Sequence, residues 1–208
     1  MISNDPQALK KWRTGRRVDL IARRIAANAA DHARWSVQID CYVASLLTDV
    51  AAKAIAFCWP YQAEYDARAP VLDCLERGAR GALPVVVAPR TPLIFREWTL
   101  EANMAPGVYD IPVPIGTSQI VPDIILIPLV GFDAEGYRLG YGGGFFDRTL
   151  AVMRPRPVTI GVGFELSRLT TIHPQWHDIP VDYVVTEKGL YRRNLNRLTL
   201  ASANLMPL

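Results

Sequence analysis

Apolar residues recur with helical spacing over the N-terminal part of the chain. Between residues 7 and 27, apolar side chains stand among basic ones, at Leu9, Trp12, Leu20, Ile21 and Ile25. This pattern predicts an amphipathic helix. Asn28 followed by Asp31 resembles a helix N-cap with its reciprocal acid, and helical spacing then continues to about Val50. The chain is therefore expected to begin with two helices.

Short apolar runs follow, and they indicate strands. The expected strands are "KAIAFCWP", "GALPVVV", "LIFREWT", "DIILIPLVGFD", "VTIGVGFE" and, closing the set, "VDYVVTE". Helices are expected in "APVLDCLERGA", with Pro70 in the first turn and Gly78 at the end, and in "FFDRTLAVM". Residues 101–122, rich in proline and glycine, are expected to be irregular.

The order of these elements predicts the fold class. "DIILIPLVGFD" is an almost continuous apolar run, which is typical of a strand covered on both faces. Strands alternating with helices predict an α/β domain with a largely parallel sheet. We expect a three-layer α/β/α, Rossmann-like architecture with a central, mostly parallel sheet, formed as a single domain by residues 1–208.

Composition narrows the functional classes only slightly. Of 208 residues, 21% are charged and the formal net charge is +3, so no nucleic-acid partner is required. A run of cations at Lys10, Lys11, Arg13, Arg16, Arg17, Arg23 and Arg24 is either a solvated helix face or one wall of an anion site. The chain shows no secretory segment and no apolar run of membrane-spanning length.

The three cysteines, Cys41, Cys58 and Cys74, each fall in an apolar stretch, and no metal-type spacing joins them. Their odd number and surroundings predict reduced core residues in a cytoplasmic protein. We expect no membrane or nucleic-acid partner.

The strongest chemical signal is the glycine-rich stretch "FDAEGYRLGYGGGFFDR", residues 132–148. It lies between an expected strand and an expected helix, where the carboxyl edge of an α/β sheet collects ligands. Bare main chain and a helix N-terminus favour a phosphate, and Arg138 adds a cation. The stretch lacks the third glycine of a dinucleotide fingerprint and the Gly-Lys-Ser/Thr of a Walker A loop. A phosphate loop and a purely structural turn both remain open.

Two acids suggest a cation at such a site. Asp147 directly follows the glycines, and Asp178 lies in "HDIPVD" between two expected strands. Mg²⁺ prefers carboxylates together with phosphate oxygens, which would reconcile a carboxylate with an anion site. The alternatives are a helix-capping Asp147 and a turn residue Asp178.

The stretch "DIILIPLVGFDAEGYRLGYGGGFFDRTLA" resembles the signature of the 5-formyltetrahydrofolate cyclo-ligase family, also called 5,10-methenyltetrahydrofolate synthetases. The resemblance extends to "AEYDARAPVLDCLERGARGALPVV", "YDIPVP" and "HDIPVDYVVTE". It implies an enzyme that uses ATP and Mg²⁺ to convert 5-formyltetrahydrofolate to 5,10-methenyltetrahydrofolate, releasing ADP and phosphate.

The resemblance also implies roles for particular residues. Arg138 and Asp147 would be catalytic, and Asp147 and Asp178 would bind Mg²⁺. Glu64 would hydrogen-bond the pterin, with Phe145, Tyr109 and Trp59 walling the folate. The triphosphate would be held by Arg13, Arg17, Arg138, Leu139, Gly140, Tyr141, Gly142, Gly143, Gly144, Phe145 and Phe146. The partners are then 5-formyltetrahydrofolate and ATP, bound by a monomer.

Several positions depart from the family pattern. Arg13 occupies a position where the family usually has Lys, and Phe145 and Phe146 occupy positions where it often has two tyrosines. A Lys found among the glycines of some members is absent, as is a Gln near "GVGFE". These departures leave open an inactive paralogue that binds nucleotide or folate for regulation. A phosphosugar isomerase or CoA-transferase-like enzyme without ATP is the other alternative.

Overall fold

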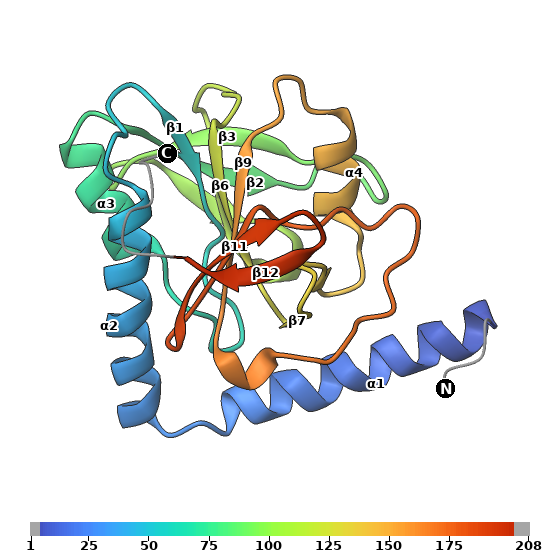
Figure 1. Cartoon of the computed structure of the whole chain (residues 1–208). Helices are drawn as coiled ribbons and strands as arrows, with labels where there is room; N and C mark the ends of the chain where they lie inside the picture. Colours follow the sequence, from blue (N-terminus) through green and yellow to red (C-terminus); the bar gives the residue numbers. More distant parts are fainter. Residues whose placement is uncertain (1–4, 202–208) are drawn as a thin grey trace.

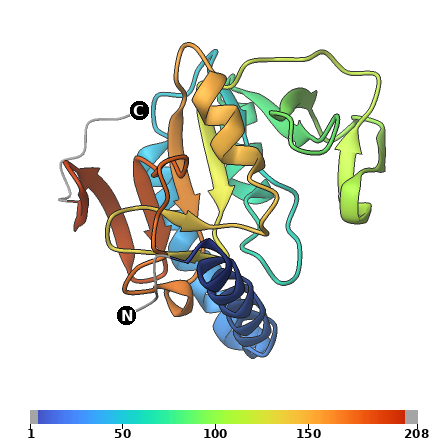
Figure 2. The same ribbon diagram turned by 90° about the vertical axis from the view of Figure 1, so that its right-hand side faces the viewer.

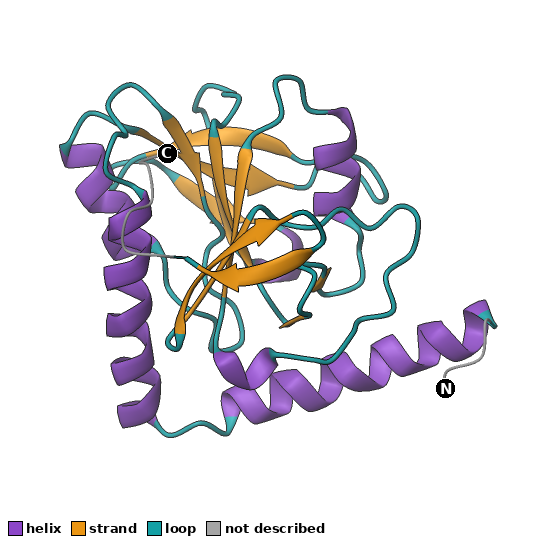
Figure 3. Ribbon diagram, in the orientation of Figure 1, coloured by secondary structure: helices purple, strands orange, loops and turns teal. Residues whose placement is uncertain are grey.

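The computed structural model describes residues 5–201. Its α-helices are α1 (Pro6–Ile25), α2 (Ala29–Leu46), α3 (Arg68–Glu76) and α4 (Phe145–Val152), and two short 3-10 helices are η1 (Val108–Asp110) and η2 (Glu165–Ser167). Figure 3 distinguishes these helices from the strands by colour. None of the helices within residues 5–201 has the length and apolar character needed to cross a membrane.

Local signals in the sequence account for the helix ends. The side chain of Asp5 accepts hydrogen bonds from the main-chain N–H groups of Gln7 and Ala8, which caps α1. Asn28 accepts from the N–H of Asp31 at 2.8 Å and caps α2, as the sequence predicts. After α3, Gly78 adopts a left-handed φ of 90°, which ends the helix.

The strands form one large sheet and two small ones. The large sheet has the order β12-β11-β10-β9-β6-β1-β2-β3. Its strands are β1 (Ala54–Ala56), β2 (Arg80–Val85), β3 (Ile94–Trp98), β6 (Ile124–Pro128), β9 (Val158–Val162), β10 (Tyr183–Thr186), β11 (Gly189–Asn194) and β12 (Arg197–Leu200). The five central strands, β10 to β2 in that order, pair in parallel, and the strands outside them pair antiparallel.

The two faces of the sheet are covered by different helices (Figures 1 and 2). On one face, α2 and α3 pack Ile39, Val43 and Val71 into a buried cluster with strand residues of β1, β6 and β9. On the other face, Leu150 of α4 packs in a second cluster with Ile125. The predicted three-layer α/β/α architecture with a mostly parallel sheet is confirmed.

Some expectations from the sequence were wrong. Residues 101–122 contain a hairpin of β4 (Met104–Pro106) and β5 (Pro112–Pro114). Its strands have only three residues each and contain prolines, so the sequence shows no alternating strand pattern there. The strand at "VDYVVTE" does not close the set, because β11 and β12 follow it. Helix α2 ends at Leu46 rather than near Val50, since the chain bends at residues 48 and 49 while Leu47 and Val50 stay buried. Cys41 is exposed on α2, so only Cys74 is a fully buried core cysteine.

Candidate active site

A cavity of about 760 Å³ opens at the carboxyl ends of β1, β2 and β6. This is the edge at which α/β sheets bind ligands. Its walls also include α1, the β4–β5 hairpin, the start of α4 and the loop of residues 176–179. Every residue that the family resemblance singles out lines it, namely Arg13, Arg17, Trp59, Glu64, Tyr109, Asp178 and the whole segment from Arg138 to Asp147.

The glycine loop, residues 140–144, connects a small hairpin to α4. The hairpin consists of β7 (Gly131–Phe132) and β8 (Arg138–Leu139), so the loop does not follow β6 directly. Gly142 and Gly144 have left-handed φ values of 95° and 64°. Gly144 is also the N-cap of α4 and offers no side-chain cap to the first turn. The main-chain N–H groups of that turn are therefore available to an anion.

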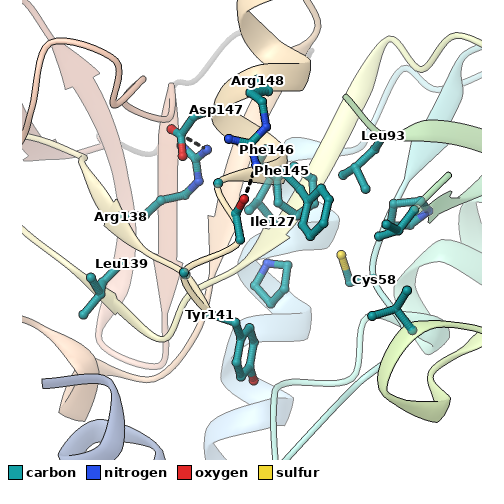
Figure 4. A pocket seen from close by; sticks show the side chains of 18 of the residues that line it. Cys58, Leu93, Ile127, Arg138, Leu139, Tyr141, Phe145, Phe146, Asp147 and Arg148 are labelled. Atoms are coloured by element: carbon teal, nitrogen blue, oxygen red, sulfur yellow. Dashed lines mark hydrogen bonds and ion pairs between the residues drawn. The ribbon is translucent and has the colours of Figure 1, made fainter. Parts of the chain in front are cut away.

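Arg138 is held at one side of this loop, against Asp147 (Figure 4). A terminal guanidinium nitrogen donates to Oδ1 of Asp147 at 3.0 Å, and the other donates to the carbonyl of Ile179. Asp147 Oδ1 also accepts from the N–H of Ile179 at 3.1 Å. Burial lowers the pKa of Arg138, while the charge of Asp147 opposes this effect. The result is a fixed cation at the wall of the cavity.

Two arginines of α1 approach the loop from the other side. Arg13 donates to the carbonyls of Ile172 and His173, and it pairs with Asp178 at 2.6 Å. Arg17 donates through Nε to the carbonyl of Gly140 at 2.6 Å. Its terminal nitrogens make no hydrogen bond to any residue between 5 and 201, although its guanidinium lies against Gly142. Arg17 is thus a cation with donors to spare beside the glycines, as is Arg148, whose Nε has no hydrogen-bond partner among the described residues.

The far part of the cavity surrounds Glu64. This carboxylate is only 6% exposed, and it accepts hydrogen bonds from the Tyr141 hydroxyl at 2.7 Å and the N–H of Tyr61 at 3.1 Å. Burial raises the pKa of Glu64, while the hydrogen bond from Tyr141 and the charge of Arg24 oppose the rise. Aromatic rings stand nearby, with Tyr61 stacked on Tyr109.

Carboxylates in the cavity are suited to a metal ion that arrives with a ligand. Among residues 5–201, no three His, Cys, Asp or Glu side chains come together as a metal cage. Asp178 is engaged by Arg13, whereas Oδ2 of Asp147 accepts no hydrogen bond from the described chain. One free carboxylate oxygen fits Mg²⁺, which keeps water and phosphate ligands and rarely needs a cage made of protein alone.

Sequence reasoning missed two side-chain roles. Arg24 was predicted only as part of a cation run that is either a solvated helix face or one wall of an anion site, yet it is 2% exposed and contacts Tyr141 and Glu64. Tyr141 was expected only among the residues along the triphosphate, but its hydroxyl contacts Glu64. A signal for Arg24 exists in the sequence, because Arg13, Arg17 and Arg24 share one helix face with the buried Leu20.

Comparisons with known proteins agree with one another. The family model described as the 5-formyltetrahydrofolate cyclo-ligase family matches residues 9–187. The 5-formyltetrahydrofolate cyclo-ligase of Haemophilus influenzae is 27% identical over 169 residues, which cover 76% of this chain and 90% of that protein. The enzyme of the same name from Escherichia coli K12 is 28% identical over 150 residues, covering 68% of this chain and 82% of that protein.

Solved structures match over more of the chain. The NMR structure of Aquifex aeolicus 5,10-methenyltetrahydrofolate synthetase has a TM-score of 0.74 and 26% identity, and the match covers 92% of this chain and 97% of that one. A 5,10-methenyltetrahydrofolate synthetase from Mycoplasma pneumoniae has a TM-score of 0.70 at 22% identity, covering 84% of this chain and 98% of that one, which shows the shared fold alone.

Proposed function

The chain belongs to the 5-formyltetrahydrofolate cyclo-ligase family, and from this premise we propose that it converts 5-formyltetrahydrofolate to 5,10-methenyltetrahydrofolate with ATP as co-substrate. The observation that carries the proposal is one cavity that joins the glycine loop, flanked by Arg17 and Arg138, to the buried carboxylate of Glu64. One end suits a polyphosphate and the other suits a ring rich in N–H donors.

The reaction needs a leaving group, because the oxygen of a formamide departs poorly. In the proposed sequence, the formyl oxygen attacks the γ-phosphorus of ATP, the bond to the bridging oxygen breaks, and ADP leaves. N10 of the folate then attacks the activated carbon, N10 loses its proton, and phosphate leaves with the former formyl oxygen. Positioning and neutralisation of charge supply most of the catalysis in phosphoryl transfer.

At the nucleotide end, we assign the triphosphate to the glycine loop and the first turn of α4. The uncapped N–H groups after Gly144 and the free nitrogens of Arg17 would bind phosphate oxygens. Arg138, fixed by Asp147 and Ile179, would neutralise charge that develops on the transferred group. Arg13, tied to the loop of residues 172–178, would close this wall.

A magnesium ion would bind at Asp147. Its free Oδ2 would share the ion with phosphate oxygens of the nucleotide, and Asp178 would contribute through water or after releasing Arg13. When bound, the ion neutralises phosphate charge. The chain's own part is to keep Asp147 oriented, which it does through the hydrogen bonds from Arg138 and Ile179.

At the folate end, Glu64 would accept hydrogen bonds from the amino group and a ring N–H of the pterin. Its two oxygens offer about four acceptor positions in general, and Tyr141 and Tyr61 use only two of them. Trp59, Tyr109 and Phe145, which line the cavity, would pack on the folate rings.

A single assay tests the proposal. Purified protein is mixed with 5-formyltetrahydrofolate, ATP and Mg²⁺, and the near-ultraviolet absorbance of the methenyl product is followed. We expect a rise that requires ATP. No rise, from protein that still binds both ligands, would leave an inactive ligand-binding paralogue, and a rise without ATP would contradict the phosphoryl-transfer step.

Asp147→Asn sharpens the assay. The amide keeps an acceptor for Arg138 and Ile179 but loses the negative charge, so we expect a folded protein with turnover reduced about a thousandfold. Turnover near that of the wild type would contradict the role of Asp147 with Mg²⁺.

We further propose that the protein acts as a monomer in the cytoplasm. One chain supplies both the glycine loop and Glu64 to the same cavity, which supports a monomer. The three cysteines are free thiols, which agrees with a reducing compartment.

A further inference from the structure

A chain of buried polar groups runs from α1 through the glycine loop to Glu64. A terminal nitrogen of Arg24 donates to the hydroxyl oxygen of Tyr141 at 2.8 Å, and that hydroxyl lies 2.7 Å from Oε1 of Glu64. Arg24 and Glu64 are themselves 3.8 Å apart at their nearest charged atoms. The three residues come from three separate segments of the sequence.

The direction of this chain is fixed by donor and acceptor chemistry. A guanidinium can only donate, so Arg24 occupies a lone pair of the Tyr141 oxygen. The single hydroxyl proton of Tyr141 must then go to Glu64. Oε1 of Glu64 is therefore held as an acceptor, which favours the ionised carboxylate.

Arg24 is a rigid anchor for this arrangement. Besides Tyr141, its guanidinium donates to the main-chain carbonyls of Gln62, Leu129 and Tyr61, at 3.0, 3.3 and 3.5 Å. It is 2% exposed, so these bonds replace all of its water. These hydrogen bonds hold the Arg24 guanidinium in one position. The guanidinium in turn fixes the position of the Tyr141 hydroxyl.

Tyr141 belongs to the same loop as the glycines proposed to hold the triphosphate. In Figure 4 its ring extends from that loop away from the pair of Arg138 and Asp147. The loop therefore presents main chain at one end of the cavity and a single side chain at the other.

We propose that Tyr141 is a positioning residue that holds Glu64 oriented and ionised for the folate, and so joins the nucleotide-binding loop to the folate-binding end. The proposal rests on the folate-binding role of Glu64 given above. The hydroxyl of Tyr141 acts through Glu64, while its ring packs edge-on against Tyr61 and is kept by a substitution to Phe.

The groups that face Glu64 come from three elements. Arg24 reaches it from α1, Tyr141 from the glycine loop and the thiol of Cys58 from the segment after β1. Burial and Glu64 itself both raise the pKa of Cys58, so this thiol stays neutral. Loss of the tyrosine hydroxyl removes the largest influence that lowers the pKa of Glu64, and that pKa should rise.

The experiment compares Tyr141→Phe, Glu64→Ala and the double variant with the wild type. Tyr137→Phe is the matched control, because Tyr137 lies in the turn between β7 and β8, outside the cavity. For each protein, dissociation constants are measured for 5-formyltetrahydrofolate across a range of pH and for ATP analogues at one pH. Thermal unfolding verifies that each variant is folded.

We expect Tyr141→Phe to weaken folate binding about tenfold at neutral pH, the loss of one hydrogen bond to a charged group. In the plot of folate affinity against pH, the loss of affinity on the acidic side should move to higher pH by about one unit, since the Glu64 carboxylate protonates more easily. Nucleotide binding should weaken less than folate binding, because the substitution keeps the main chain of the loop. Tyr137→Phe should bind both ligands as the wild type does. Because Tyr141 acts through Glu64, the double variant should bind folate no more weakly than Glu64→Ala.

Two outcomes would overturn the proposal. One is a pH profile of Tyr141→Phe that matches the wild type, a result that needs no Glu64 variant. The other is additive losses in the double variant, which would show that Tyr141 acts independently of Glu64. Wild-type folate affinity in Glu64→Ala would instead contradict the proposed function of Glu64, whatever Tyr141 does.

Discussion

Arginine side chains make most of the polar contacts around the cavity, and each has a different set of partners. Arg24 is fully enclosed, Arg138 is fixed by one carboxylate and one carbonyl, and Arg17 keeps free donors. The three arginines thus differ in how many of their donors the protein already uses. Single substitutions should therefore affect ATP affinity and folate affinity to different degrees.

Arg138→Ala should weaken ATP binding far more than folate binding, because Arg138 lies beside the glycine loop. The variant also leaves Asp147 without its main partner, and Asp147 is partly exposed, so we expect a loss of about 2 kcal/mol in unfolding free energy. Titration of each ligand and urea unfolding measure the two effects.

Arg156→Ala is the matched control for stability. Arg156 pairs with Asp182 at the surface, where an ion pair contributes less than about 1 kcal/mol. Equal loss of ATP and folate affinity in Arg138→Ala would mean that the triphosphate lies elsewhere.

Glu64 should make stability depend on pH in a specific direction. Burial raises its folded pKa above the unfolded value, so the folded state binds the proton more tightly. Its contribution to stability is fully present below the unfolded pKa of about 4.3 and is lost as pH rises through the folded pKa.

Relative to Glu64→Gln, which cannot titrate, the wild type should therefore lose unfolding free energy as pH rises above about 4.3 and through the raised folded pKa of Glu64. Urea unfolding of both proteins across this range gives the difference. A difference that stays constant, or that grows with pH, would contradict the raised pKa.

At the scale of elements, the shape of the glycine loop depends on left-handed backbone conformations at Gly142 and Gly144. Gly142 has a φ of 95°, and an added Cβ would lie 3.3 Å from the Arg17 guanidinium. Gly15, in the middle of α1, has helical neighbours and no atom within 4 Å of an added Cβ.

Gly142→Ala should thus strain the loop and displace Arg17, weakening nucleotide binding about tenfold or more. Gly15→Ala should stabilise the protein by up to about 1 kcal/mol, because alanine favours the helix. Nucleotide titration and thermal unfolding of both variants check this. Similar behaviour of the two would show that the left-handed backbone at Gly142 has no role.

The strong patterns of the sequence predicted most elements that build the site. The first two helices, the central parallel strands and the helix after the glycines all follow from periodicity and caps. The β4–β5 and β11–β12 hairpins were not predicted. Their strands are short or half-exposed, and long-range pairing rather than local pattern determines them.

The candidate site was predictable to a similar degree. Glycines and acids in one motif indicated the residues that line the cavity, although their roles stay predictions. The contact between Tyr141 and Glu64 could not be predicted, because it joins residues 77 positions apart. Arg24 has the composition of a surface cation, and only the packing of α1 against three other segments buries it.

At the scale of the whole molecule, α1 ties distant parts of the chain together. In Figures 1 and 2 it crosses one end of the sheet, and its arginines reach the 172–178 loop, the glycine loop and the segment near Gln62. Contacts from α1 to three later segments therefore form one wall of the cavity.

Arg13→Ala should loosen the loop that carries Asp178. Arg13 contributes hydrogen bonds to two carbonyls and the carboxylate there, so amides of residues 173–179 should exchange with solvent faster, while those of β6 stay protected. Hydrogen exchange measured by mass spectrometry tests this. Arg16→Ala is the control, since Arg16 is exposed and its contacts among residues 5–201, an ion pair with Asp19 and a position over the Trp12 ring, lie within α1. If amide exchange in residues 173–179 did not change in Arg13→Ala, Arg13 would not be what holds this loop in place.

The ion pair between Arg13 and Asp178 spans 165 positions of sequence. During synthesis, the amino-terminal helix leaves the ribosome long before its acidic partner is translated. Arg13 therefore stays without this partner until residue 178 has been translated. A chain that ends before Asp178 therefore lacks this ion pair, and its α1 has no carboxylate from the 172–178 loop to hold Arg13.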